Sequence, residues 1–198
     1  MPEGQAGVCA LVLAAGQGSR YREQADVDKL LEPSLAEDGS PPVLLATLSA
    51  LQGVAERLVV VTRDDNHQLL DWLEARVAEL GIEICSLRTR GLGHSLAQAA
   101  ARYPAPRGWL VVLADMPYVQ PRTFHRIAAA IGEASLIVPV CNGQRGNPRG
   151  VGASHRQALL TLDGERGAQT LFTENPVIEI EVDDAGVLQD IDRPADRR

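Results

Sequence analysis

Residues 8–20 read VCALVLAAGQGSR, in which an apolar run at 8–13 is followed by small residues and glycines at 14–18 and then by Arg20. A short apolar run of this kind is typical of a strand buried on both faces, and the glycines allow a tight turn at its carboxyl end. Backbone N–H groups in such a turn can approach a phosphate closely, and the arginine can add a charge-assisted contact. The stretch therefore predicts a buried parallel strand with an anion site at its end.

Short apolar runs continue to alternate with longer amphipathic segments, which is the pattern of strands that are separated by helices. The expected strands are 8–13, 58–62, 82–87, 109–113, 136–139 and 177–182. The expected helices are 42–51, 66–80, 94–102, 121–131 and 155–162, with a further turn or two at 166–173. The polar stretches 21–28 and 34–40 are expected to be loops. This order predicts one α/β domain over 1–198, with a mostly parallel sheet in a Rossmann-like three-layer α/β/α arrangement.

The composition favours a cytoplasmic protein with a small-molecule substrate. No apolar run approaches the roughly 20 residues of a membrane-spanning helix, so we expect neither a membrane partner nor a signal peptide. Cys9, Cys85 and Cys141 form no CxxC pair, which argues against a disulfide framework and a zinc site. A formal net charge of -7 argues against nucleic acid as a partner, since that binding depends on neutralising phosphates.

Lys29 is the single lysine among the 19 lysine and arginine residues of the chain. An ammonium group is compact and strongly hydrated, whereas a guanidinium group is planar and forked, so the two are not interchangeable at a binding site. A chain that otherwise uses arginine can keep one lysine where a compact charge is needed. The alternative is an ordinary surface lysine.

Two common nucleotide-binding motifs, the GxGxxG dinucleotide loop and the P-loop, do not match the stretch 13–20. Tyr21 stands where the third glycine of a GxGxxG dinucleotide loop would fall, and the chain has no GK[ST] triplet of a P-loop. A strand-to-helix turn without a ligand is the structural alternative. The stretch alone therefore assigns no ligand.

Asp115 follows the apolar run 109–114, at the expected carboxyl end of a buried strand. Ligands of open α/β sheets bind beyond the carboxyl ends of the strands, so this carboxylate is well placed to bind a metal there. Mg²⁺ typically takes one or two protein carboxylates and completes its shell with waters and substrate phosphates. The alternative is that Asp115 caps the helix that begins near Pro121.

Two segments of the sequence, 13–20 and 28–31, together resemble the signature of a known enzyme family. LAAGQGSR at 13–20 and DKLL at 28–31 resemble the signature of the molybdenum-cofactor nucleotidylyltransferases, the MobA-like NTP transferases. Four further blocks resemble the family in the same order: GLGHSL at 91–96, LADMP at 113–117, GNP at 146–148 and DIDRPAD at 190–196. The first of these four resembles a glycine-rich loop of the cytidylyltransferase branch, and the third resembles a Gly-His-Pro loop near the acceptor.

The resemblance implies a nucleotide-diphospho-sugar transferase-like fold and a role for each matching residue. Lys29, Arg20 and Asp115 would be catalytic, and Mg²⁺ would be held by Asp115 with Asp192, or with Asp190 as the reserve. The residues expected to contact the nucleoside triphosphate (NTP) or the acceptor are Leu13, Ala14, Ala15, Gly16, Gly18, Ser19, Gly91, Gly93, Ser95 and Asn147.

By this resemblance the chain transfers CMP from CTP to molybdopterin in its molybdenum-loaded form. Ala15 and the loop 91–96 favour CTP over GTP, because the GTP-using branch more often has a second glycine at position 15. A guanylyltransferase and a sugar-phosphate nucleotidylyltransferase are the enzyme alternatives. A third alternative is a non-catalytic chaperone that delivers the cofactor to an apo-molybdoenzyme. Asn147, which stands in place of histidine, leaves this alternative open, whereas intact Lys29 and Asp115 argue against it.

Overall fold

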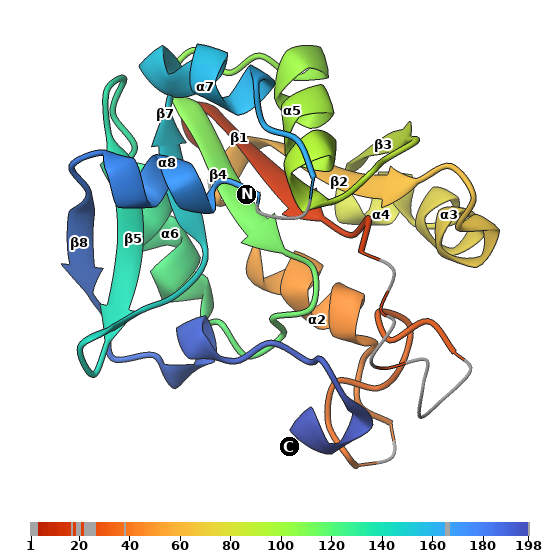
Figure 1. The fold of residues 1–198 in the computed structure, drawn as a ribbon. Helices are drawn as coiled ribbons and strands as arrows, with labels where there is room; N and C mark the ends of the chain where they lie inside the picture. The colour runs from red at the N-terminus through yellow and green to blue at the C-terminus, as the bar shows by residue number, and fades with distance from the viewer. Residues whose placement is uncertain are drawn as a thin grey trace.

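One sheet of eight strands, in the order β3-β2-β1-β4-β7-β5-β6 with β8 beside β5, organises the part of the chain that the structure describes (Figure 1). The structure is a computed structural model, which describes residues 4–16, 18, 21, 27–37, 39–164 and 167–197. No helix among these residues is long and apolar enough to cross a membrane.

The first half of the sheet is parallel. It consists of β1 (Gln5–Leu13), β2 (Ala55–Arg63), β3 (Glu83–Leu87) and β4 (Gly108–Leu113). Leu13, the last residue of β1, is aligned with Val61 of β2 and with Leu113 of β4. The carboxyl ends of β1 and β4 therefore lie side by side, as the sequence analysis required for a shared site.

The second half of the sheet is mixed. It consists of β5 (Leu136–Cys141), β6 (Gln144–Arg145), β7 (Arg149–Gly152) and β8 (Ile178–Glu181), with β7 antiparallel to both β4 and β5. The sequence analysis did not predict β6 and β7. Both are short and rich in glycine or polar residues, so they lack an apolar run and form by pairing with longer strands.

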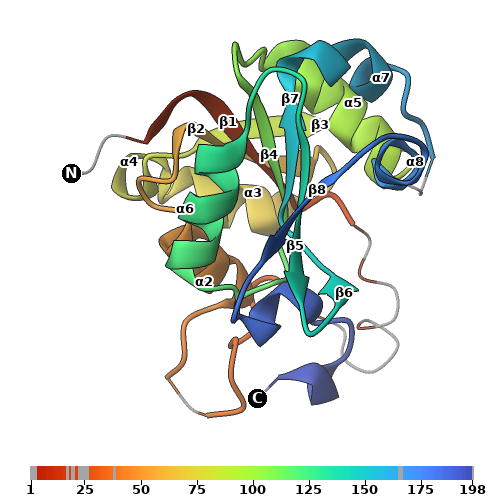
Figure 2. The ribbon, with the colours of Figure 1, turned by 90° about the vertical axis from the view of Figure 1, so that its left-hand side faces the viewer.

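Helices cover both faces of the sheet, which Figure 2 shows close to edge-on. One face is covered by α2 (Val43–Ala50), α3 (His67–Glu74), α4 (Val77–Leu80) and α6 (Pro121–Ala130), and the other by α5 (Leu92–Arg102), α7 (Arg156–Leu160) and α8 (Gln169–Glu174). Buried residues form a separate apolar cluster on each side. The three-layer α/β/α prediction is confirmed.

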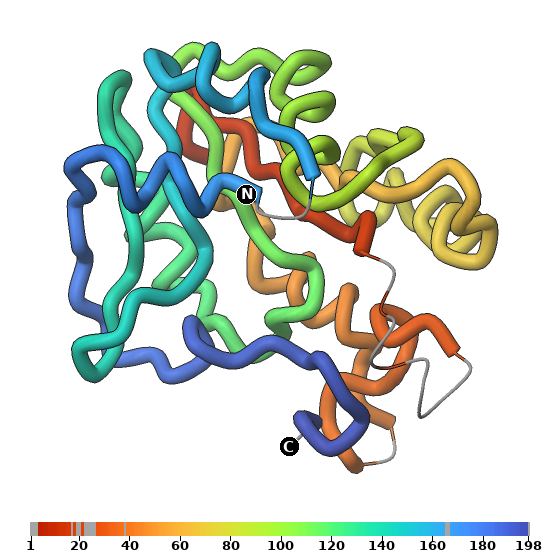
Figure 3. Tube along the Cα trace, viewed as in Figure 1, coloured from red at the N-terminus to blue at the C-terminus, as the bar shows by residue number. Residues whose placement is uncertain are grey.

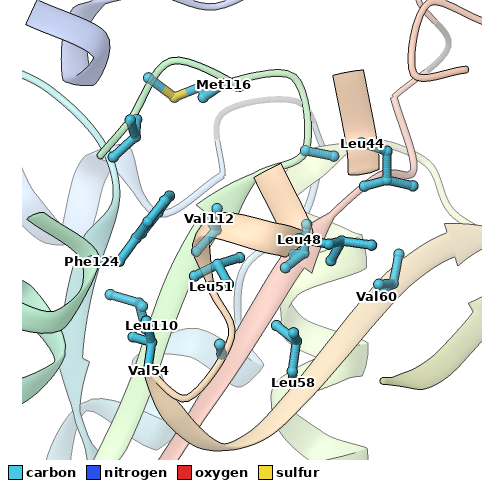
Figure 4. Packing of buried hydrophobic residues seen from close by; sticks show 14 of the residues in the cluster. Leu44, Leu48, Leu51, Val54, Leu58, Val60, Leu110, Val112, Met116 and Phe124 are labelled. Atoms are coloured by element: carbon cyan, nitrogen blue, oxygen red, sulfur yellow. The ribbon is translucent and has the colours of Figure 1, made fainter. Parts of the chain in front are cut away.

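Helix α2 packs on the sheet close to the end of β4 (Figure 4). Leu44 and Leu48 are fully buried in the same cluster as Val112 of β4. Thr47 is also fully buried, and its hydroxyl donates to the carbonyl of Ala114 at 3.1 Å. This contact holds the chain in place immediately before Asp115.

The helix that was predicted over 66–80 is divided into α3 and α4. The guanidinium of Arg76 lies 4.4 Å over the ring of Trp72 and donates to the Trp72 carbonyl at 3.0 Å. The backbone N–H of Arg76 bonds instead to Leu73, one residue short of α-helical spacing. The Arg76 side chain therefore donates to the Trp72 carbonyl, which in a continuous α-helix would accept from the backbone N–H of Arg76.

The C-terminal segment returns across the end of the sheet. In Figure 3 it passes below the end of β4 and finishes beside the segment that leads into α2. It contains two short 3₁₀ turns, η2 (Ala185–Leu188) and η3 (Pro194–Asp196). Arg197 lies 3.9 Å from Glu32, which places the two distant segments together.

Asp184 fastens this return segment to α6, and we expect its loss to destabilise the protein. Its carboxylate is 2% exposed and accepts hydrogen bonds from the Gln120 and Gly186 N–H groups at 2.9 and 3.0 Å and from the Thr123 hydroxyl at 2.5 Å. Asp184→Ala leaves these buried donors without a partner, so the free energy of unfolding should fall by about 2–4 kcal/mol in urea titrations.

The neighbouring exposed residue provides the matched control. Asp183→Ala should change the free energy of unfolding by less than about 0.5 kcal/mol, because its side chain is solvent-exposed. Equal losses in the two variants would contradict the assignment of Asp184 as the fastening group.

Candidate active site

Three segments that are far apart in the sequence meet at the carboxyl ends of β1 and β4. The parallel hydrogen-bond ladder extends one residue past each strand, with Ala14 N–H donating to Val61 at 2.8 Å and Ala114 N–H donating to Leu13 at 3.2 Å. Asp115 follows directly. The strand ends are therefore held at a defined separation before the chain turns into the site.

Lys29 lies at the centre of this meeting point. Its ammonium nitrogen is 2.6 Å from Asp115 Oδ2 and 3.7 Å from Asp192 Oδ1, and it donates to the Ile191 carbonyl at 2.8 Å. The Lys29 side chain is 14% exposed and the Asp115 side chain 19%. The single lysine is therefore a largely buried member of a charged cluster, which contradicts the alternative of an ordinary surface lysine.

Ile191 positions the acidic C-terminal segment. Its side chain is fully buried, and its N–H donates to the Asp115 carbonyl at 2.9 Å while its own carbonyl accepts from Lys29. The residues on either side, Asp190 and Asp192, are thereby held next to Asp115. The sequence analysis did not predict a role for Ile191, since an apolar residue between two acids gives no signal of which backbone groups it presents.

Asp115, Asp190 and Asp192 together form a possible divalent metal site. Each offers a carboxylate oxygen, and the three oxygens lie within 4.8 Å of one another. Protein atoms packed around the carboxyl of Asp190 raise its pKa above the ordinary value, and the charges of Asp115 and Asp192 raise it further. Convergent oxygen donors with excess negative charge fit a hard cation such as Mg²⁺ or Mn²⁺.

A cavity of about 70 Å³ adjoins Lys29 and Asp115. Of the residues that the sequence analysis singled out, it is lined by Leu13, Ala14, Gly16, Gly18, Lys29 and Asp115. Gly18 has φ +59°, and a Cβ at this position would lie 3.9 Å from the Lys29 stem, so the glycine turn runs against the lysine. Ala15 is buried beside this cavity-lining stretch without lining the cavity itself. Ser19 and Arg20 lie outside the described residues.

Asp28 positions Lys29, a role that the sequence analysis missed. Its carboxylate accepts from the Leu30 N–H at 3.0 Å and from the Asn66 side-chain amide at 2.7 Å. Asn66 in turn caps α3 by accepting from the Leu69 N–H. The residue before Lys29 is therefore tied both to the residue after it and to the start of a helix.

The block 91–96, which resembles a glycine-rich loop in sequence, forms the N-cap and first turn of α5 and is braced internally. Ser95 is fully buried, and its hydroxyl contacts Thr89 at 2.7 Å and the Gly91 carbonyl at 3.0 Å. The N–H of Gly93 donates to the carbonyl of Gly164 at 2.8 Å. These groups already have protein partners, so Gly93 and Ser95 hold the first turn of α5 in place, while Gly91 caps the helix with φ +141°, a conformation that favours glycine.

Asn147 lies in a second cavity, of about 290 Å³, together with Leu113, Met116 and Asp190. Its N–H donates to the Val187 carbonyl of η2 at 2.9 Å. A Cβ at Gly146 would collide with that same carbonyl, so only glycine allows the approach. The loop 146–148 is thus held on the segment that carries Asp190, on the opposite side of Leu113 from the first cavity.

Solved structures with this fold include two that align with nearly the whole chain. Rv0371c from Mycobacterium tuberculosis H37Rv superposes with a TM-score of 0.79 at 28% identity, covering 99% of this chain and 96% of that one. A nucleotidyl transferase from Methanothermobacter thermautotroptrophicus superposes with a TM-score of 0.76 at 24% identity, covering 96% and 93%. The second likeness shows the fold alone.

Sequence comparison gives a related result. The bifunctional protein GlmU of Thermus thermophilus is 31% identical over 155 residues, which cover 77% of this chain and 32% of that protein. The chain therefore spans about a third of the length of the curated relatives it matches. A model of the MobA-like NTP transferase domain matches residues 10–179. Because that match covers most of the chain, the protein belongs to the MobA-like NTP transferase family.

Proposed function

We propose that this protein is a nucleotidyltransferase that transfers CMP from CTP to the phosphate of molybdopterin in its molybdenum-loaded form and releases pyrophosphate. The observation that carries the proposal is the convergence of Lys29 with Asp115, Asp190 and Asp192 between two cavities. The first cavity, beside the glycine turn, has the character of a triphosphate site. The second, beside Asn147, would hold the acceptor.

Lys29 would reduce the repulsion between the two anions that react. An acceptor phosphate that attacks the α-phosphate of an NTP brings two anions together, so a fixed cation must reduce their repulsion and stabilise the transition state. The ammonium of Lys29 is held in place by Asp115 and by the Ile191 carbonyl. Such a preorganised charge requires little rearrangement as the negative charge shifts.

The acidic cluster would hold the divalent metal. Its three carboxylates match the donor preference of Mg²⁺, and partial burial together with the charges of Asp115 and Asp192 raises the pKa of Asp190. A bound ion would supply positive charge to the triphosphate. A structure of Rv0371c is described as a complex with manganese, which supports a divalent metal in this fold.

The choice of base rests on the family resemblance, because neither Ala15 nor residues 91–96 line the first two cavities. Ala15 and the block 91–96 support CTP, and one fold neighbour at 14% identity, CMP:2-keto-3-deoxy-manno-octonic acid synthetase, is described in complex with CTP. That neighbour is named for a sugar acid, so a sugar-phosphate nucleotidylyltransferase is the second candidate. The guanylyl and chaperone alternatives have no separate structural observation in their favour.

Pyrophosphate release tests the proposal directly. Wild-type protein with Mg²⁺ should release pyrophosphate from CTP in preference to GTP, UTP or dTTP, and only when molybdenum cofactor extract is added. Release with a sugar 1-phosphate in place of the extract would favour the second candidate. Binding of the cofactor without any release would favour the chaperone.

Replacing Lys29 should separate its catalytic charge from metal binding. Lys29→Met keeps most of the side-chain length and removes the charge, so kcat should fall by about 100-fold or more. Mn²⁺ should bind at least as tightly as in the wild type, because the ammonium no longer competes for Asp115. Steady-state kinetics and Mn²⁺ electron paramagnetic resonance measure the two effects. Unchanged kcat would remove Lys29 from the mechanism.

Asp115→Asn should abolish Mn²⁺ binding and lower kcat by about 100-fold or more while the protein remains folded. The carboxylate is a member of the proposed metal site and is partly exposed, so the amide can be accommodated. Titration with Mn²⁺ and circular dichroism would check this. Full activity at limiting Mg²⁺ would overturn the site.

The variants Asp190→Asn and Asp192→Asn, measured side by side, should show which of the two aspartates binds the metal ion together with Asp115. Asp192→Asn should weaken Mn²⁺ binding more strongly if Asp192 is the principal partner, which is the expectation from the family resemblance. A larger loss in Asp190→Asn would reverse that assignment.

A further inference from the structure

A third cavity, of about 260 Å³, lies on the face of the sheet covered by α5 and α8. Its walls are largely apolar and include Leu92, Leu96 and Val111. Arg149, the first residue of β7, also lines it, opposite Val111 in the antiparallel pairing of β7 with β4. A charged side chain thus reaches an apolar cavity from a strand that the sequence did not predict.

Arg149 is unusual among the arginines of this chain. Its guanidinium stacks 4.9 Å from the centre of the Phe172 ring, and its Nε is buried without a hydrogen-bond partner. By contrast, Arg57 forms two hydrogen bonds with Glu83. Burial, and to a smaller extent the charge of Arg145, lower the pKa of Arg149. Among the residues that the structure describes, no carboxylate forms an ion pair with it.

Stacking on an aromatic ring does not supply hydrogen-bond acceptors to the N–H groups of a guanidinium. A guanidinium carries five N–H donors in its plane, and contact with an aromatic ring uses its face. The donors in the plane remain able to bind an oxyanion, for which their forked geometry is well suited. A half-buried cation of this kind is the complement of an anionic ligand.

The cavity shares lining residues with the two that form the proposed active site. Leu13 lines both this cavity and the one beside Lys29. Leu113 and Asn147 line both this cavity and the one that contains Asp190. A ligand whose phosphate lies near Asp190 and Asn147 can therefore extend past Leu113 toward Arg149.

We propose that Arg149 binds a second anionic group of the acceptor, distinct from the phosphate that receives the nucleotide. The chain then selects acceptors in which two anionic groups are joined by an apolar or flat body, which contacts the walls of the third cavity. This inference rests on the proposed function, because it assigns the ligand to the acceptor side of the same site.

Two matched probes isolate the second anion. Phenyl phosphate carries one anionic group, and 4-carboxyphenyl phosphate adds a carboxylate to the same flat apolar body. Their affinities are measured by calorimetry on the full chain with Mg²⁺ and α,β-methylene-CTP, which occupies the triphosphate site without reacting. Wild-type protein should bind the carboxylated probe at least about tenfold more tightly.

Arg149→Met should reduce this ratio to about one while keeping the affinity for phenyl phosphate, since methionine retains a contact with the Phe172 ring. Arg149→Gln provides a second variant should the first unfold. Arg122→Met is the control, because it removes the same charge from an exposed position on α6, on the opposite face of the sheet, and should keep the wild-type ratio.

Each other result has a defined meaning. A wild-type ratio near one, or a preference that survives in Arg149→Met, overturns the inference. Loss of affinity for α,β-methylene-CTP with an unchanged probe ratio would assign Arg149 to the nucleotide and also overturn it. The measurement involves no turnover, so failure to release pyrophosphate would reject the proposed function without deciding this result.

Discussion

The contact of Lys29 with Asp115 and with the carbonyl of Ile191 joins three parts of the chain at one point. Lys29 belongs to the segment after the glycine turn, Asp115 follows the end of β4, and Ile191 belongs to the C-terminal return. Ile191 also donates to the Asp115 backbone, so each segment is held by the other two. If any one of the three shifted, both the cation and the acidic cluster would lose their positions.

This arrangement places like charges together, which carries a cost to folding. The raised pKa of Asp190 reflects that cost, because packing and the neighbouring acids both disfavour its charged form. Lys29 compensates part of the negative charge from a largely buried position. A cluster of carboxylates beside a fixed ammonium is suited to bind a metal and a phosphate chain together, which the proposed nucleotidyl transfer would require.

The two halves of the sheet supply different parts of the site. The parallel half brings the glycine turn and Asp115 side by side, because parallel strands end at the same edge. The mixed half adds Asn147 and Arg149, which enter from β7 and the loop before it. On the proposed function, variation in this second half would change the acceptor while the glycine turn and Asp115 remained the same.

The sequence alone determined the layers of the fold and placed the glycine turn and Asp115 at the carboxyl ends of two buried strands, because apolar periodicity and residues that follow strands are local signals. It did not determine β7, the division of α3 from α4, or the internal bracing by Ser95, since these depend on partners elsewhere in the chain. Lys29 meets Asp115 across 86 positions and Ile191 across 162. Contacts of that separation, and the stacking of Arg149 on Phe172, exist only when the sheet has brought its strands together, so the tertiary structure alone decided them.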